Sequence, residues 1–140
     1  MQIPGHLAVA LAQSNLPLFR CKSRRLLIPL LIASLFPDIV DKTIGYVFHA
    51  MPNGRHYAHN VFSLLGLSLL VTMVWGKAAG YAWFSGYLGH LLVDNDGTLP
   101  WFFPLKKYPF EPGRLKFEPL QILRETIFLV LVLIIRRVSC

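Results

Sequence analysis

Charged residues are scarce in this chain, where they make up 15% of 140 residues. A soluble domain usually has roughly 25%, and the mean hydropathy here is +0.50. This composition favours a membrane protein over the alternative, a soluble helical bundle with a very apolar core. The net charge of +7 does not indicate a nucleic-acid partner, because the basic residues do not form one stripe interleaved with exposed aromatic residues.

Cysteine is nearly absent as well. Cys21 and Cys140 form neither a metal-binding pair nor a disulfide framework. The first residues lack the basic segment and the long apolar core of a cleaved signal peptide, so we expect the N-terminus to remain in the mature protein. The sequence contains no repeat and no low-complexity tract, and its length suits one domain better than two.

Apolar segments bounded by proline, glycine or charge predict five helices. We expect the second to break near Pro37, because proline cannot continue the hydrogen-bond pattern of a helix. The apolar runs are shorter than the ~20 residues that cross an ordinary bilayer, so local thinning or shallow insertion would be needed. The helices are expected at residues 6–16, 26–40, 56–75, 78–94 and 117–137.

The expected fold class is therefore all-α: an integral membrane bundle of about five helices with a polar site at one end. We expect a single membrane-embedded domain over residues 1–140. Within it, residues 1–98 carry the site, residues 99–118 form an aromatic, proline-rich interfacial loop, and residues 119–140 form a C-terminal helix. The aromatic side chains of the loop suit the headgroup level of a membrane.

Ionisable residues are expected to gather at the two ends of the bundle. An up-and-down arrangement is the default for helices joined by short loops, and it places alternate helix ends together. One end then collects three imidazoles and two carboxylates: His6, Asp38, His59, His90 and Asp94. The opposite end collects seven basic residues and no acid: Arg20, Lys22, Arg24, Arg25, Lys77, Arg136 and Arg137.

The imidazoles and carboxylates at the first end favour a divalent metal site. His90 and Asp94 are one helical turn apart and can point the same way. A buried cluster of ionisable groups is costly unless something neutralises it. Imidazole nitrogen and carboxylate oxygen are ligands of Zn²⁺, with Mn²⁺ as the alternative. Asp41, Asp96 or Asn60 could hold the second nitrogen of a ligating imidazole.

Each residue also has a simpler interpretation. A lone histidine in an apolar helix, such as His6, is usually a core residue. Asp38 could end a helix, Asp94 could lie at a solvated helix end, and Arg55 could contact a lipid headgroup or be a loop charge. The convergence of five such residues at one end is what favours the metal. Two further histidines, His49 and His56, are treated as bystanders. His56 could nevertheless share a helix face with His59, which is three residues further along the chain.

Five short motifs occur in order along the first 104 residues. They are Gly5-His6, Pro37-Asp38 with Asp41, Gly54-Arg55 with His59-Asn60, Gly86-Tyr87 with His90 and Asp94, and Trp101 with Pro104. Together they resemble the membrane-bound metal-dependent hydrolase family of the YbcI/YdjM type, also labelled DUF457. The sequence departs from the pattern of that family in the spacing of Asp38 and Asp41, in Asn60 where Ser is common, and in Ala58 where Thr is common.

The resemblance implies a membrane-bound metal-dependent hydrolase. The five clustered residues would hold one or two metals and a water whose pKa falls towards ~7. Arg55 would stabilise charge on a phosphate oxygen, and Asp41 or Asp96 would act as general base or as a hydrogen-bond partner. A site at the end of a bundle in lipid points to a phosphoester or acyl ester of a membrane lipid as substrate.

The competing function is a non-enzymatic metal or proton carrier that uses the same residues. A carrier should have ionisable groups at mid-membrane depth on several helices, whereas here they cluster at one end. A purely structural subunit would leave His90 and Asp94 unexplained. The number of Lys and Arg barely decides the orientation of a multi-pass topology. Both cysteines lie at the basic end, which favours a reducing cytoplasm there and a site that faces outside.

Overall fold

The structure, a computed structural model, describes residues 2–17, 19, 24–113 and 118–139, and all regular structure within these ranges is helical. The helices are α1 (Ile3–Gln13), α2 (Arg24–Lys42), α3 (Val61–Trp75), α4 (Lys77–Val93) and α5 (Pro119–Ser139), and a short π-helix, η1 (Thr43–Val47), continues α2. The predicted all-α class is confirmed. Within the described ranges, none of the helices combines the length and the apolarity needed to cross a membrane. Four residues used in the orientation prediction lie outside these ranges: Arg20, Cys21, Lys22 and Cys140.

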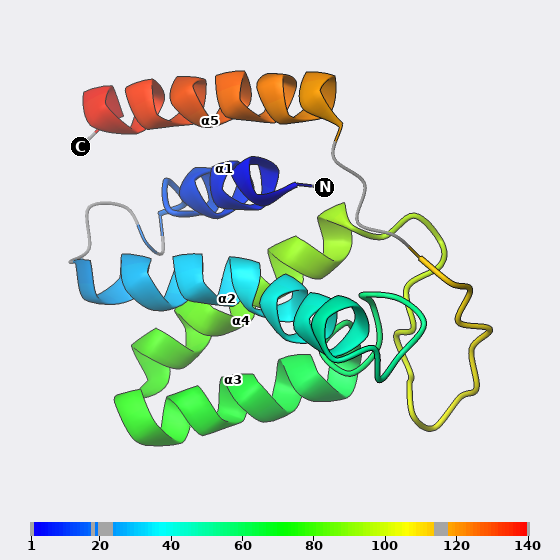
Figure 1. The fold of residues 1–140 in the computed structure, drawn as a ribbon. Coiled ribbons are helices and arrows are strands. Elements are labelled where there is room, and N and C mark those ends of the chain that lie inside the picture. Colours follow the sequence, from blue (N-terminus) through cyan, green and yellow to red (C-terminus); the bar gives the residue numbers. More distant parts are fainter. Residues whose placement is uncertain (1, 18, 20–23, 114–117, 140) are drawn as a thin grey trace.

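Successive helices run in alternating directions (Figure 1). Helices α2 and α4 form the centre, α1 lies over them, α5 covers α1, and α3 packs on α4. The start of α1, the end of α2, the start of α3 and the end of α4 consequently lie at one end of the bundle. This is the end at which the sequence predicts the polar site.

The close contact between α2 and α4 depends on Gly86. A Cβ atom at this position would lie 2.2 Å from the carbonyl oxygen of Leu30, so a glycine is required for the two backbones to approach. Ala33, Trp83 and Tyr87 belong to the buried core beside this contact. The core therefore fixes the ends of α2 and α4 relative to each other, and with them the polar residues that these ends carry.

The predicted break near Pro37 is wrong. Helix α2 continues through Pro37 to Lys42, although proline cannot donate a hydrogen bond to the preceding turn. Pro37 is buried, and α2 packs closely on α4. This packing offsets the missing hydrogen bond, because most helical stability in proteins comes from tertiary contacts. Asp38 and Asp41 consequently lie on α2 itself.

Helix α3 begins at Val61 and not at residue 56. The side chain of Asn60 accepts a hydrogen bond from the backbone N–H of Ser63 at 2.9 Å, which is the arrangement of a helix N-cap. Asn60 therefore caps α3 and does not hold an imidazole. Residues 56–60 form a loop that leads into the polar end of the bundle.

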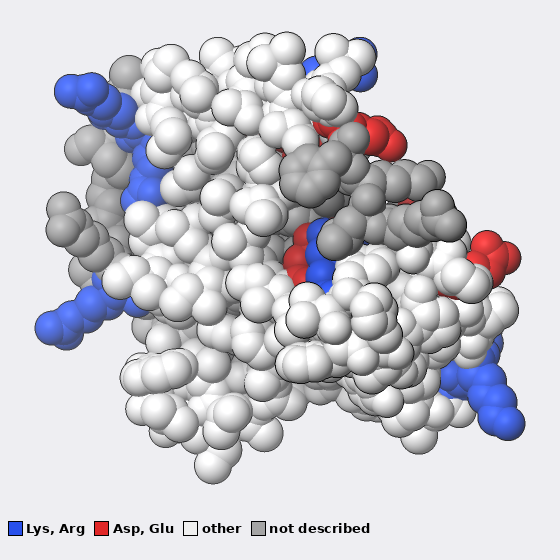
Figure 2. All heavy atoms as spheres, in the orientation of Figure 1, with Lys and Arg blue, Asp and Glu red and all other residues white. Residues whose placement is uncertain are grey.

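The outer faces of α3 and α5 are apolar and exposed. Leu69, Met73 and Trp75 of α3 are 61%, 76% and 68% exposed. Among the α5 side chains that the structure describes, only Glu125 and Val132 are buried. Figure 2 shows no Lys, Arg, Asp or Glu over α3, at the bottom of this view. Exposed apolar surface of this extent is typical of surfaces that contact lipid, another protein or a ligand.

Candidate metal centre

Four buried side chains come together where α2 and α4 end. Asp38 lies near the end of α2, His59 lies in the loop before α3, His90 lies in the last turn of α4, and Asp94 is its C-cap. One possible ligand atom from each residue lies within 4.8 Å of the others. This group could hold a metal ion.

Hydrogen bonds decide which nitrogen of two histidines faces the cluster. His59 Nδ1 lies 2.8 Å from Oδ2 of Asp41, and His90 Nδ1 lies 2.7 Å from the carbonyl oxygen of Ser34. A carboxylate and a carbonyl only accept hydrogen bonds, so each Nδ1 carries the hydrogen and donates it. The neutral form of either ring would then have its lone pair at Nε2. The two Nε2 atoms lie 3.1 Å apart.

Two lone pairs that face each other at this distance need a cation or a proton between them. Tetrahedral Zn²⁺, with Zn–N bonds of about 2.0–2.1 Å, holds two imidazole nitrogens roughly 3.3 Å apart. Oδ1 of Asp38 lies 3.6 Å from His59 Nε2 and 3.9 Å from His90 Nε2, and it is buried without a hydrogen-bond partner among the described residues. The donor set of neutral nitrogen and carboxylate oxygen fits a Zn²⁺ or Mn²⁺ ion.

Basic side chains hold the two carboxylates from outside the cluster. Nζ of Lys42 lies 2.6 Å from Oδ2 of Asp38, and Nη2 of Arg55 lies 3.2 Å from Oδ2 of Asp94. These contacts fix the orientation of the two carboxylates and so of their other oxygens. The sequence analysis missed Lys42, although its i, i+4 spacing from Asp38 on one helix is a signal that could have identified it.

His6 lies beside the four-residue group. Its Nε2 is 3.4 Å from Oδ1 of Asp94 and 3.7 Å from Oδ2 of Asp38. Its ring stacks on His90 with 4.0 Å between the ring centroids. Neither of its buried ring nitrogens makes a hydrogen bond within the described residues. The structure thus brings the five predicted ligands together, with His6 as the outlying member, and their role as ligands stays a prediction.

Glu125 of α5 positions the helix that carries His6. Its carboxylate accepts hydrogen bonds from the backbone N–H groups of Gln2 and Gly5, each at 3.0 Å. Glu125 is buried, and a carboxylate at the start of a helix offsets the unpaired N–H groups there. The sequence analysis missed this contact. The available signal was an acidic residue within an apolar C-terminal helix.

Asp41 is a hydrogen-bond acceptor for the loop before α3. Besides the ring of His59, it accepts hydrogen bonds from the backbone N–H groups of His56, Ala58 and His59 at 2.7 to 3.1 Å. Asp41 is fully buried. The arrangement matches the predicted role as a partner of a ligating imidazole better than the predicted role as general base.

Asp96 stays outside the cluster. Its side chain is 56% exposed and lies 2.7 Å from Nη1 of Arg55, and it also accepts hydrogen bonds from Thr98. Partial burial alone would raise the pKa of Asp96, but the hydrogen bonds from Thr98 and Arg55 lower it to about 2. Burial alone would lower the pKa of Arg55, but Asp96 and Asp94 raise it. Arg55 is therefore a permanent cation, and Asp96 is a weak base at neutral pH.

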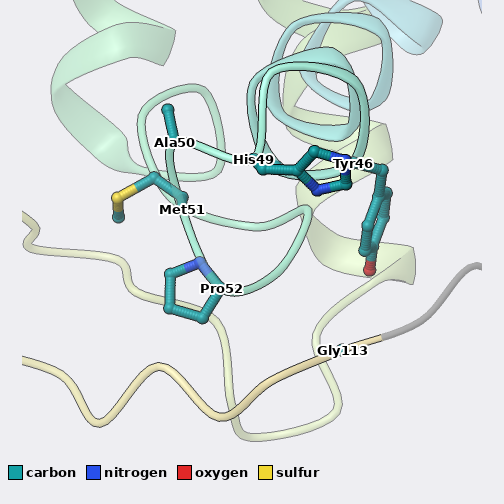
Figure 3. Close-up of a pocket in the computed structure, with 7 residues that line it drawn as sticks. Tyr46, His49, Ala50, Met51, Pro52 and Gly113 are labelled. Carbon is teal, nitrogen blue, oxygen red and sulfur yellow. The ribbon is translucent and has the colours of Figure 1, made fainter.

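The two histidines predicted as bystanders differ. His56 is buried, and its backbone N–H donates a hydrogen bond to Asp41, the residue that also contacts the ring of His59. His49 is exposed and lines a separate surface cavity of about 610 Å³. Figure 3 shows its side chain together with those of Tyr46 and Pro52, which line the same cavity. His49 therefore remains a bystander in the structure, and His56 does not.

An apolar cavity of about 300 Å³ lies next to the cluster. Asp38 and Lys42 contribute to its wall, and most of the remaining lining is aliphatic or aromatic. Ile3 from α1 and Leu35 and Ile39 from α2 belong to this lining. The cavity gives an apolar group a place beside a carboxylate of the candidate metal site.

The comparison with known families agrees with the motifs. A family model described as YdjM inner membrane protein matches residues 1–139. No curated protein and no solved structure matches the chain. Because the match covers nearly the whole sequence, the chain belongs to the YdjM inner membrane protein family, as its motifs predicted.

Proposed function

Starting from membership of the YdjM inner membrane protein family, we propose that this chain is a membrane-bound, metal-dependent hydrolase. The observation that carries the proposal is the 3.1 Å approach of two lone-pair nitrogens, Nε2 of His59 and Nε2 of His90. Zn²⁺ is the proposed metal, with Mn²⁺ as the alternative.

The chain divides the work between residues that hold the metal and residues that position them. The metal, when bound, supplies a water acidic enough to give hydroxide near neutral pH. Asp41 and the carbonyl of Ser34 fix the tautomers of the two imidazoles. Lys42 and Arg55 hold the two carboxylates. The residues that would hold the metal are Asp38, His59, His90 and Asp94, with His6 as a further ligand.

Arg55 has a second proposed role at the substrate. Two of its N–H groups bind Asp94 and Asp96, which leaves three of its five donors for an anion. Because these carboxylates raise its pKa, it keeps its charge when a substrate approaches. It can therefore stabilise negative charge on a phosphate oxygen in the transition state.

The apolar cavity beside Asp38 supports a lipid substrate. A phosphoester or acyl ester of a membrane lipid could place its chain along Ile3, Leu35 and Ile39 and its polar group against Lys42. The exposed apolar faces of α3 and α5 support a position in lipid as a multi-pass bundle. Figure 2 shows Lys and Arg without Asp or Glu at the left end of this face, where α2 begins and α5 ends. The count of Lys and Arg barely decides the orientation, and the proposal that the metal site faces outside rests on the two cysteines predicted at the basic end.

The test is chelator-sensitive lipid hydrolysis by the full chain in detergent. Phosphatidic acid and phosphatidylglycerol serve as probes, and the products of hydrolysis at each ester bond are quantified, namely phosphate, glycerol, glycerol phosphate and fatty acid. We expect turnover that stops with EDTA, returns with Zn²⁺ or Mn²⁺, disappears in His59→Ala and persists in the matched control His49→Ala. Turnover that survives EDTA or His59→Ala contradicts the proposal, and so does metal-loaded protein that hydrolyses neither probe.

A further inference from the structure

A second apolar groove lies at the basic end of the bundle, away from the candidate metal site. It has a volume of about 970 Å³ and lies between α2, α3 and α4. Ile28 and Ile32 of α2, Leu70 of α3 and Trp83 of α4 are among its lining residues. Of the described residues that line it, Arg25 alone is charged. The groove is thus apolar along its length with a cation at one end.

Trp83 closes the inner wall of the groove. Its side chain lines the groove and is only 7% exposed. Its indole nitrogen is buried and has no hydrogen-bond partner within the described residues. Because this atom is not accessible from the groove, Trp83 offers a ligand there only apolar contact.

The mouth of the groove is positively charged. Arg25 lies at the start of α2, and Lys77 directly precedes the lining residue Ala78 at the start of α4. Both basic side chains are exposed. Helix α5 ends at the same end of the molecule with Arg136 and Arg137 in its last turn (Figure 1). Basic residues beside an apolar surface attract anionic lipid headgroups.

We infer that this groove binds one anionic lipid. The headgroup phosphate lies at Arg25 and Lys77, and an acyl chain follows α2 towards Phe36. Arg25 and Phe36 are separated by about 16 Å of helix at a rise of 1.5 Å per residue. An anionic headgroup followed by an apolar chain matches the order of cation and apolar wall along the groove.

The inference is tested by native mass spectrometry of the full chain in detergent. The probes are dioleoyl phosphatidylglycerol and dioleoyl phosphatidylcholine. The protein also carries His59→Ala, so that hydrolysis at the proposed metal site does not consume the probe. We expect one phosphatidylglycerol per chain, with an affinity about tenfold above that of phosphatidylcholine.

A matched pair of variants tests the headgroup contact. Arg25→Gln should weaken phosphatidylglycerol binding about fivefold, whereas Arg124→Gln, an exposed arginine of α5, should change it less than twofold.

A variant that fills the groove tests whether the lipid occupies it. Ala79, which lines the groove, is replaced by Phe, and retention of the helical circular dichroism signal identifies folded protein. Folded Ala79→Phe should lose the bound lipid. Three results would overturn the inference. The first is equal retention of phosphatidylglycerol and phosphatidylcholine, and the second is an Arg25→Gln effect no larger than that of Arg124→Gln. The third is retention of the lipid by folded Ala79→Phe. A change from dimer to monomer in Ala79→Phe with unchanged lipid retention also overturns it and identifies the groove as an interface between two copies.

Discussion

At the end of the bundle where α4 ends, imidazoles and carboxylates are buried against one another, with Asp38 4% exposed and His90 2% exposed. At the end where α4 begins, Arg25 and Lys77 remain exposed beside an apolar groove. Burial of ionisable groups is costly unless they pair with one another or bind a metal. The buried end could therefore hold a metal ion, whereas the charges at the exposed end do not need one because they remain solvated.

The largest effect, on the free energy of unfolding, is expected when the buried end loses a hydrogen-bond acceptor. Asp41→Ala leaves the N–H groups of His56, Ala58 and His59 and the His59 ring without their partner. We expect the free energy of unfolding to fall by about 3–5 kcal/mol. Lys77→Ala at the exposed end should change it by less than ~0.5 kcal/mol. Denaturant unfolding in detergent measures both, and equal effects at the two ends would remove the contrast between them.

A smaller effect, on metal affinity, is expected when a carboxylate of the buried end loses the side chain that fixes its orientation. Arg55→Lys keeps the charge but cannot bridge Asp94 and Asp96 with two N–H groups. Loss of such a supporting contact should weaken metal binding about 10-fold to 100-fold. Competition with a chromophoric chelator measures the dissociation constant, and Arg124→Lys is the control. An unchanged dissociation constant would show that Asp94 does not depend on Arg55 for its position.

The smallest expected effect concerns Glu125 of α5, which contacts the start of α1. Glu125→Gln retains an acceptor oxygen but loses the charge that faces the start of α1. We expect the free energy of unfolding to fall by about 1 kcal/mol, seen as a melting temperature lower by several degrees. Glu118→Gln, at an exposed position, should leave it unchanged. A similar loss in both variants would mean that Glu125 does not hold α1.

Much of the polar site could be predicted from the sequence. Helices joined by short loops alternate in direction, so His6, Asp38 and His90 had to lie at one end once their helices were located. The i, i+4 spacing of His90 and Asp94 placed them on one helix face. Local pattern and connectivity were sufficient for these residues because both depend only on positions along the chain.

The supporting contacts could not be predicted in the same way. The carbonyl of Ser34 accepts from His90, and any residue type provides a backbone carbonyl, so the sequence carries no signal for it. Glu125 reaches the start of α1 across more than 100 residues of sequence. The continuation of α2 through Pro37 depends on packing against α4. These features arise from tertiary contacts, which override local propensity.

Metal content tests the central claim most directly. Elemental analysis is carried out on chain purified in detergent without chelators, for the wild type, His59→Ala, His90→Ala and the control His49→Ala. The account predicts about one zinc or manganese per wild-type chain, the same content in His49→Ala, and its loss in both cluster variants. Folded wild-type protein that contains no metal and takes up none from Zn²⁺ or Mn²⁺ solution would contradict the account.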